Sequence, residues 1–176
     1  MRIANVGGTA VPVDHLIGGE WVGSPTTFES RSPLDWDGGV LANVARGDQI
    51  TADAAVEAAI AGFAVWGKYS VAERAAVMHK MADLIEAHND EIAMVESLDM
   101  GFMYESMKNR LVARGAVNFR LYADLIVAHE ERTWDAKNMR NLVQRMPAGP
   151  AVVITPWNAP FMLSTWKLAP ALAAGN

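Results

Sequence analysis

The 176-residue sequence contains no cysteine, and this absence removes several kinds of chemistry from the residues shown. Disulfide bonds, thiolate metal sites and a cysteine nucleophile all require a residue that the chain lacks. The sequence also lacks an excess of positive charge, since its formal net charge is −5 at pH 7. We therefore expect no binding to nucleic acid, which depends on a basic surface that neutralises phosphates.

No segment has the features of a secretory leader or of a membrane span. Residues 1–14 contain one basic residue and three glycine or proline residues, so they lack the charged start and compact apolar run of a signal peptide. Residues 146–175 carry only one charge, but five prolines and Asn158 interrupt them. We expect a soluble, cytoplasmic protein that does not contact a membrane.

The N-terminal part of the chain predicts short strands joined by turns. We expect residues 1–14 to form a tail and residues 17–22 to form a hairpin, because Gly18-Gly19 lies between apolar residues. The dipeptide Ser32-Pro33 and the run Asp37-Gly38-Gly39 predict turns. Residues 40–44 predict a further short strand.

Two helices follow, and each has an identifiable start. Thr51 is a suitable N-cap for the first, and residues 56–67 carry apolar side chains at helical spacing. The run Ser70-Val71-Ala72-Glu73 fits a capping box, in which the serine hydroxyl and the glutamate carboxylate satisfy free backbone N–H groups reciprocally. Behind it, an apolar stripe predicts the face that packs against the core: Val71, Ala75, Met78, Ala82 and Ile85.

The pattern of elements changes in the second half of the chain. We expect a third helix, capped by Asn89 and ending near Gly101, and a fourth over residues 104–129. Residues 141–145 predict an extended segment, residues 151–155 a buried strand and residues 160–174 a helix. A strand, a short loop and a helix in this order are typical of the opening unit of an α/β nucleotide-binding domain. The predicted fold class is therefore α/β.

Local motifs for phosphate or metal binding are missing from the sequence. Neither the dinucleotide fingerprint GxGxxG nor a P-loop occurs. The four histidines have no metal-ligand spacing, so we predict no metal site and expect surface or packing roles for His15, His79, His88 and His129. The acidic side chains expected on solvated helix faces are those of Glu73, Glu86, Glu91 and Glu96.

The segment from Ile154 to Pro160 differs from the rest because it places an amide side chain in a stiff loop. Pro156 and Pro160 fix φ on either side of Asn158. The loop follows a predicted strand, at the position where α/β proteins bind ligands. Asn158 is therefore a candidate functional residue. The alternative is a turn asparagine that only bonds its own backbone.

Much of the chain resembles the aldehyde dehydrogenase superfamily. The likeness is strongest in PAGPAVVITPWNAP at residues 147–160 and in WKLAPALAAGN at residues 166–176. Upstream, IGGEWV at residues 17–22 and ESLDMG at residues 96–101 are similar to the first hairpin and an early helix of the family. The resemblance covers nearly everything from about residue 15 to residue 176, in order.

This resemblance implies the N-terminal part of an aldehyde dehydrogenase-like fold. Residues 15–134 would form N-terminal hairpins and the helical part of the cofactor-binding domain, and residues 135–147 part of an oligomerisation hairpin. Residues 148–176 would supply the first strand, loop and helix of the nucleotide-binding sheet. The implied reaction is oxidation of an aldehyde to a carboxylic acid with NAD or NADP, through a cysteine thiohemiacetal. The cysteine and the general-base glutamate would lie further along, so we expect the segment alone to be inactive.

The resemblance also assigns roles to individual residues. Asn158 would donate its side-chain N–H to the oxygen that gains negative charge in the reaction, an interaction typically worth about 2.7 to 4 kcal/mol per donor. The residues assigned to the NAD(P) site are Ile154, Thr155, Pro156 and Trp157. Those assigned to the substrate pocket are Ala159, Leu163 and Trp166. For the last two, ordinary packing explains the residue types equally well.

The resemblance implies partners, and two other classes of function stay open beside it. Family members are dimers or tetramers, so we expect a homodimer or homotetramer that binds a small-molecule aldehyde. The first alternative is a naturally truncated, non-catalytic chain that acts as an assembly or interaction module. The second is a binding protein for a small aldehyde or a nucleotide. The sequence does not rank semialdehydes, aromatic aldehydes and aliphatic aldehydes as substrates.

Overall fold

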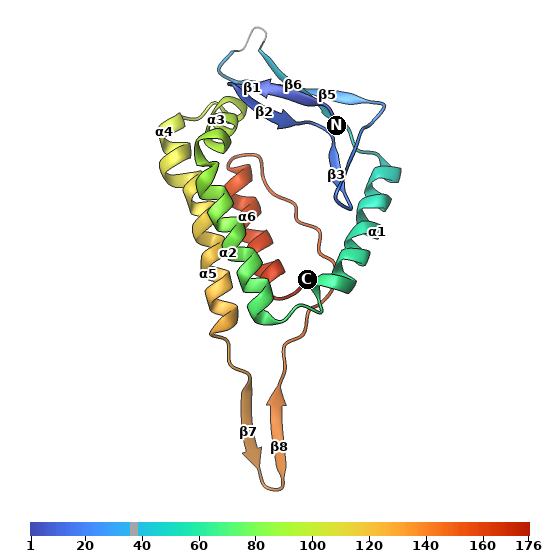
Figure 1. The fold of residues 1–176 in the computed structure, drawn as a ribbon, viewed down its shortest axis with the longest axis vertical. Helices are drawn as coiled ribbons and strands as arrows, with labels where there is room; N and C mark the ends of the chain where they lie inside the picture. The colour runs from blue at the N-terminus through green and yellow to red at the C-terminus, as the bar shows by residue number, and fades with distance from the viewer. Residues whose placement is uncertain (36–38) are drawn as a thin grey trace.

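The fold combines antiparallel hairpins with a group of helices (Figure 1). The computed structural model describes residues 1–35 and 39–176, so the turn expected at Asp37-Gly38-Gly39 lies mostly outside the described residues. Within these ranges, each strand pairs antiparallel with a single partner. The four hairpins are β1 (Ile3–Val6) with β2 (Thr9–Pro12), β3 (His15–Ile17) with β4 (Glu20–Val22), β5 (Thr27–Arg31) with β6 (Val40–Ala45), and β7 (Arg132–Ala136) with β8 (Met139–Val143).

The first two hairpins share one turn design. The hairpin expected at residues 17–22 is confirmed, with Gly18 and Gly19 at φ +60° and +88°. The tail expected at residues 1–14 is wrong, because Gly7 and Gly8 adopt φ +58° and +90° and turn the chain back on itself. Two consecutive positive φ values favour the tight turn that matches the twist of paired strands. The same Gly-Gly signal was present in both places.

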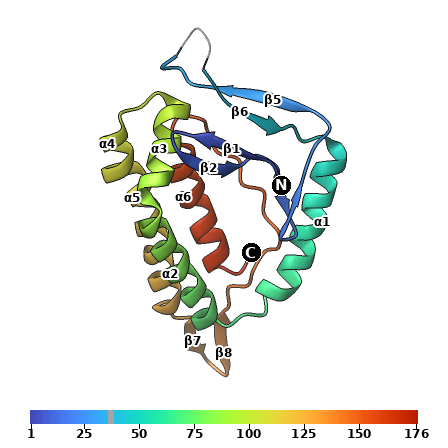
Figure 2. The ribbon, with the colours of Figure 1, turned by 45° about the horizontal axis from the view of Figure 1, so that its top comes forward.

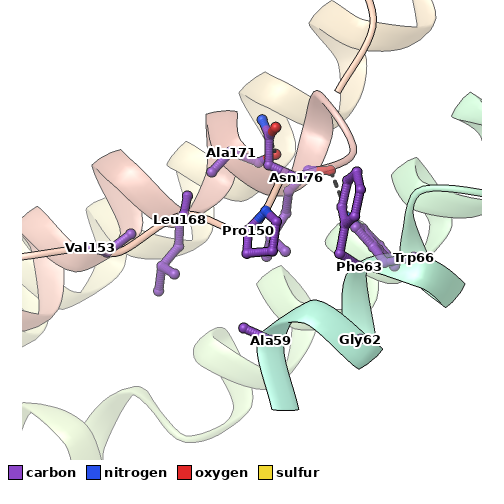
Figure 3. A pocket seen from close by; sticks show the side chains of 11 residues that line it. Ala59, Gly62, Phe63, Trp66, Pro150, Val153, Leu168, Ala171 and Asn176 are labelled. Carbon is purple, nitrogen blue, oxygen red and sulfur yellow. Dashed lines mark hydrogen bonds between the residues drawn. The ribbon is translucent and has the colours of Figure 1, made fainter. Parts of the chain in front are cut away.

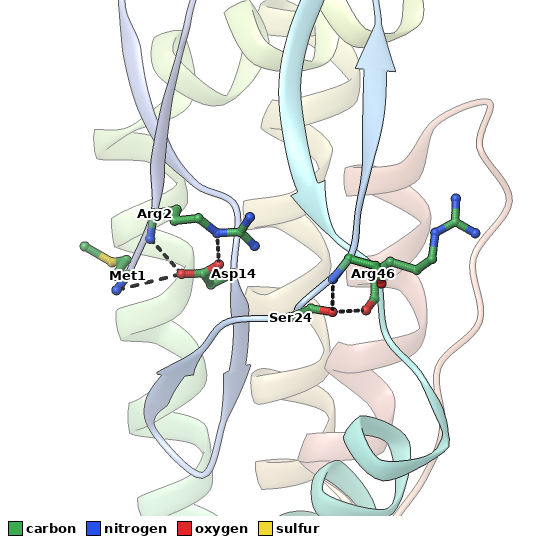
Figure 4. Close-up of polar contacts among 6 residues, drawn as sticks. Met1, Arg2, Asp14, Ser24 and Arg46 are labelled. Atoms are coloured by element: carbon green, nitrogen blue, oxygen red, sulfur yellow. Dashed lines mark hydrogen bonds and ion pairs between the residues drawn. The ribbon is translucent and has the colours of Figure 1, made fainter.

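Polar contacts close the first and the third of the N-terminal hairpins (Figure 4). The backbone N–H and the Nε of Arg2 donate to the carboxylate of Asp14 at 2.6 and 2.7 Å, which joins the two ends of the β1–β2 hairpin. The hydroxyl of Ser24 donates to the carbonyl oxygen of Arg46 at 2.6 Å and fixes the segment before β5 beside the segment after β6.

The four helices expected between residues 51 and 129 are all present. They are α1 (Gln49–Trp66), α2 (Val71–Ala87), α3 (Asn89–Met100) and a long irregular helix made of α4 (Tyr104–Ser106), the π-helix η1 (Met107–Val112) and α5 (Ala113–Val127). The periodicity of the sequence did not indicate the π-helical turn. The helix expected after the Asn158 loop is confirmed as α6 (Pro160–Ala173).

Helix starts were predicted with mixed success. The capping box of α2 is confirmed, with Ser70 and Glu73 bonded reciprocally. Thr51 is not the cap of α1, because Asp48 accepts from its N–H and its hydroxyl, both at 2.8 Å. Asn89 does not cap α3 either, since its Nδ2 donates instead to the carbonyl oxygen of Lys108 at 3.1 Å. The end of α3 at Gly101, with φ +67°, agrees with the prediction.

The core lies where α2, α5 and α6 pack together (Figure 2). From the predicted stripe of α2, Ala75, Met78 and Ala82 are buried, whereas Val71 at the helix start stays exposed. The neighbouring helices present mostly small side chains to them: Ala116, Phe119, Ala123, Ala169 and Ala173. Alanines at these positions allow the three helix axes to approach closely. A second, smaller cluster contains Ala93, Met107 and Val112.

The strand expected at residues 151–155 does not form. The segment is extended but has no regular secondary structure, and Val152 and Ile154 are 80% and 79% exposed. It runs between α6 and α1, where no described strand lies beside it to pair with its backbone (Figure 1). Apolar side chains on the facing helix, including Val56 and Ile60, are exposed as well. The residue pattern is that of a buried strand, but its partners are not among the described residues.

The β7–β8 hairpin projects away from the helices (Figure 1). The extended segment expected at residues 141–145 overlaps β8, and the paired region spans residues 132–143. Almost every residue of the two strands is exposed, so the hairpin contributes nothing to the core. No helix in the described part of the chain is both long enough and apolar enough to cross a membrane.

Candidate functional site

The Asn158 loop, residues 156–159, joins the extended segment to the start of α6. Ala159 is buried and takes the N-cap position with φ −161° and ψ 62°, and its carbonyl oxygen accepts from the N–H of Leu163 at 2.9 Å. Pro160 is the first helical residue, where its missing N–H costs nothing. The side chain of Asn158 lies exposed between Ala159 and Trp157. Prolines on either side restrict the loop backbone, and no hydrogen bond within the described residues engages the Asn158 amide.

Contacts with α5 fix the start and the middle of α6. The ring of Phe161 passes so close to Gly115 that a Cβ there would lie 2.7 Å from its Cε1. One turn later, Asn118 donates through Nδ2 to the hydroxyl of Thr165 at 2.9 Å, and both residues are buried. A buried hydrogen bond between two side chains penalises any sliding of the helices, because a shift would leave the Asn118 amide without its acceptor. These contacts set the position of the loop that precedes α6.

The end of α6 is tied down by a set of polar contacts (Figure 3). Gly175, with φ +87°, and Asn176 donate backbone N–H groups to the carbonyl oxygens of Leu172 and Ala171, which is the Schellman arrangement. The indole N–H of Trp66 also donates to Leu172, at 3.1 Å. These contacts together close the C-terminal end of α6.

Asn176 also joins the end of α6 to the beginning of the extended segment. Its side-chain Oδ1 accepts from the N–H groups of Ala148 and Gly149, at 2.6 and 3.1 Å. Nearby, Nε of the buried Arg74 donates to the carbonyl oxygen of Ala173 at 3.1 Å. Residues 148 and 176 therefore lie side by side, and the chain between them forms the extended segment, the Asn158 loop and α6.

The expectation that Glu96 is solvated is wrong. It lies on α3 with its carboxylate half-buried, and its Oε2 is 3.5 Å from the backbone nitrogen of Phe161. Burial raises the pKa of Glu96 to about 7; the Phe161 N–H acts in the opposite direction and the charge of Asp99 adds to the increase. Removal of the carboxylate from water outweighs the single hydrogen bond that it gains.

The residues predicted for the cofactor and the substrate lie on two connected stretches. Ile154, Thr155, Pro156 and Trp157 form one continuous and largely exposed segment, in which Trp157 is 86% exposed. Leu163 and Trp166 share one face of α6, and Ala159 occupies the N-cap position one turn before Leu163. The three residues go from buried through half-buried to exposed. The apolar groove in Figure 3 is a different feature, formed by α1, residues 150–153 and α6. None of the predicted pocket residues lines it.

The structure adds residues that contact the elements around the Asn158 loop and that the sequence did not indicate. They are Arg74, Glu96, Gly115, Asn118 and Asn176, the last through its side-chain contact with the backbone of residue 148. A glycine inside a predicted helix is the one available signal among them, because it costs stability unless another group approaches closely. Long-range hydrogen bonds such as that from Asn118 leave no local pattern. Within the described residues, no His, Asp and Glu side chains are grouped in a way that could hold a metal ion.

Comparison with known proteins identifies the family. The model described as "Aldehyde dehydrogenase family" matches residues 21–176, which is most of the sequence. The chain belongs to the aldehyde dehydrogenase family. The resemblance seen in the sequence is confirmed, and so is the α/β fold as an N-terminal portion of the aldehyde dehydrogenase fold.

Relatives of this aldehyde dehydrogenase chain are considerably longer than 176 residues. It is 42% identical to 2-hydroxymuconic semialdehyde dehydrogenase of Pseudomonas sp. (strain CF600), covering 93% of this chain and 35% of the relative. It is 35% identical to 5-carboxymethyl-2-hydroxymuconate semialdehyde dehydrogenase of Escherichia coli, with the same two coverages. The AldA indole-3-acetaldehyde dehydrogenase of P. syringae, a mutant solved with NAD+ and IAA, superposes with a TM-score of 0.89 at 33% identity. That match covers 94% of this chain and 34% of the other.

Proposed function

We propose that this chain is the N-terminal segment of an NAD(P)-dependent aldehyde dehydrogenase, in which Asn158 supplies an oxyanion hydrogen bond. The observation that carries this proposal is the exposed amide of Asn158 in a loop whose flanks are held by prolines and by α6. The chain spans about a third of the length of its curated relatives. The remaining machinery, including the nucleophile, would then be supplied by residues that this cysteine-free chain does not contain.

The chemical role of Asn158 follows from where charge develops. When a nucleophile adds to the carbonyl carbon of an aldehyde, the C=O π electrons move onto the oxygen. An N–H that already points at that oxygen stabilises the new charge without having to reorganise. The Asn158 side chain fits this task, because no hydrogen bond within the described residues engages its amide. Removal of one such donor typically lowers turnover by about 10²–10³-fold.

The residues before Asn158 fit the apolar part of a nicotinamide cofactor. Ile154, Pro156 and Trp157 present exposed apolar surface, and Thr155 adds a hydroxyl. The start of α6 does not fit a phosphate group, because the carboxylate of Glu96 already lies beside it. This agrees with the missing GxGxxG motif. When bound, NAD or NADP accepts the hydride that the substrate carbon loses. We leave the choice between the two open.

For the substrate, we propose a semialdehyde of the muconic type. The two curated relatives compared above are named for such compounds. On this chain, Ala159, Leu163 and Trp166 would form one apolar side of the pocket, since they follow the proposed oxyanion donor along one face of α6. An unsaturated carbon chain beside the aldehyde suits a surface of this kind.

For the assembly, we propose a homodimer or homotetramer, with the β7–β8 hairpin as a contact between copies. An isolated two-stranded hairpin is only marginally stable in water. This one nevertheless exposes several large apolar side chains, including Trp134 and Leu142. Pairing with a second copy would cover them. We extend the proposal to a cytoplasmic location, where NAD and NADP are available.

The test is the activity of the full gene product that carries this chain. We expect oxidation of 2-hydroxymuconic semialdehyde that depends on NAD or NADP, followed through the absorbance of the reduced cofactor. A coding sequence that continues past codon 176 into a cysteine-containing region is expected as well. A native stop codon there, together with no activity, would instead support the non-catalytic assembly module, which the family relationships do not favour.

A further inference from the structure

Helix α6 begins without a capping side chain of its own. Ala159 occupies the N-cap position and offers no oxygen, and Pro160 has no N–H. The first N–H groups of the helix that need a partner therefore belong to Phe161 and Met162. They lie directly behind the Asn158 loop. An acceptor that binds these N–H groups therefore also restricts the movement of the loop.

Glu96 supplies the missing acceptor from another helix. Its Oε2 lies 3.5 Å from the nitrogen of Phe161, although the two residues are 65 positions apart. The N-terminal end of a helix carries partial positive charge, so a carboxylate there is favoured electrostatically. The ring of Phe161 passes close to Gly115 of α5 and also packs against the cluster that contains Ala93 of α3. The start of α6 is therefore held from two sides, by a ring contact and by a charge.

We propose that Glu96 is a positioning residue for the Asn158 loop, acting as the N-cap that the sequence of α6 does not supply. The inference rests on the proposed function, because it matters for catalysis only if Asn158 is the oxyanion donor. Glu96 does not act on the substrate itself. Its carboxylate holds Phe161, and Phe161 lies three positions after Asn158. A displacement of the loop by a fraction of an ångström would weaken the hydrogen bond from Asn158 to the oxyanion, because the strength of that bond depends on a preorganised position.

The charge around Glu96 decides in which pH range this contact works. Charged residues on the elements that contact α3 and α6 include Asp99 of α3, Glu105 of α4, Lys108 and Arg110 of η1, and Arg114 of α5. Strands β1 and β2, which also touch α3, carry no charged residue. Lys108 is paired with Asp90 at 2.7 Å. Of this set, Asp99 acts on the pKa of Glu96, in the same direction as burial. The carboxylate form therefore dominates only above about pH 7.

Amide hydrogen exchange of the 176-residue chain tests the contact without any catalysis. We expect Glu96→Ala to speed exchange at Phe161 and Met162 by about tenfold, which corresponds to the loss of one capping interaction. Glu96→Gln keeps an acceptor oxygen and should stay close to the natural chain. Glu57→Gln, on the exposed surface of α1, is the matched control. Unchanged exchange in Glu96→Ala would overturn the proposal, and so would a uniform increase along the whole of α6.

Kinetics of the full gene product test the consequence for the loop. We expect Glu96→Ala to lower kcat by about tenfold while KM for the cofactor is unchanged, and Glu96→Gln to recover most of kcat while flattening its pH profile near pH 7. Unaltered kcat in an active Glu96→Ala enzyme, despite faster exchange at Phe161, would also overturn the positioning role. An inactive natural enzyme would refute the proposed function instead, and in that case the exchange experiment alone decides whether Glu96 caps α6.

Discussion

The side-chain oxygen of Asn176 accepts a hydrogen bond from the backbone N–H of Ala148 at 2.6 Å, across 28 positions of the sequence. A second bond, from Gly149 at 3.1 Å, reinforces it. The residues between these two points form the extended segment, the Asn158 loop and α6. Asn176 therefore closes the unit that carries the proposed oxyanion donor, at the end opposite to Glu96.

Replacing Asn176 with alanine should destabilise the chain. The two N–H groups at residues 148 and 149 would lose their acceptor, which typically costs about 1–3 kcal/mol when the groups are not fully solvated. Urea denaturation measures the change in the free energy of unfolding. Asn43→Ala is the matched control, because that asparagine is exposed on β6 and should change stability by less than about 0.5 kcal/mol. Equal losses in the two variants would show that the Asn176 contact contributes nothing.

Two glycines inside helices should respond oppositely to alanine. At Gly115, a Cβ would lie 2.7 Å from Phe161 and 3.3 Å from Thr165, so the variant should lose about 1–3 kcal/mol through overpacking. At Gly62 of α1, nothing lies within 4 Å of the new Cβ, and the variant should gain about 0.5–1 kcal/mol from helix propensity. Thermal unfolding of both variants measures the difference. A stabilised Gly115→Ala chain would mean that Phe161 is not held against α5.

The sequence predicted the helical part of this fold well, because helix signals are local. The capping box at Ser70, the end of α3 at Gly101 and the helix after Pro160 each depend on neighbouring residues, and all three are present. The strand at residues 151–155 failed for the opposite reason. Its continuous apolar run is typical of a strand that other strands flank and helices cover. A strand forms only where a neighbouring strand is available to pair with its backbone. Helix α1 forms as predicted, but the partners that its apolar side chains would need are missing from the described residues as well, so that no residue of α1 is buried.

The exposed apolar segments should make the isolated chain self-associate. Val152, Ile154 and Trp157 are 79–86% exposed, and Val152 lies beside Val56 of α1, which is exposed as well. Contiguous apolar surface of this kind marks a contact site or an aggregation site. Light scattering of the 176-residue chain should show dimers or larger species, and Val152→Lys should reduce their fraction. A monodisperse monomer for the natural chain would contradict this prediction.

The stability of the chain should fall as the pH rises from about 4.5 to about 7. Glu96 has a pKa raised by burial to about 7, against an ordinary value of 4.5. Between these values the folded chain holds a proton that the unfolded chain has released, so raising the pH favours unfolding. Asp48 and Glu73, whose pKa values are lowered by hydrogen bonds to Thr51 and Ser70, act only at more acidic pH. Melting temperatures across this range should decline for the natural chain and less for Glu96→Gln. Identical slopes would show that Glu96 is not buried.

The candidate site was only partly predictable, and Glu96 illustrates why. The loop around Asn158 stands out in the sequence, because two prolines and a family motif mark it locally. In the sequence, Glu96 does not differ from any other acidic residue on an amphipathic helix. What distinguishes it is its contact with the backbone N–H of Phe161 in another helix. Asn118 and Arg74 are similar cases, in which a polar side chain is buried only because a distant segment covers it. Tertiary partners of this kind cannot be inferred from spacing.

The central claim concerns Asn158, and its most direct test is Asn158→Ala in the full gene product. We predict that kcat falls by about 10²–10³-fold, as expected for the loss of one oxyanion donor, while the Kd for the nicotinamide cofactor stays the same. Asn109→Ala is the matched control, because that exposed amide on η1 bonds, among the described residues, to Glu105 alone, and its loss should leave kcat unchanged. Turnover of the Asn158→Ala enzyme equal to that of the natural enzyme would contradict the account.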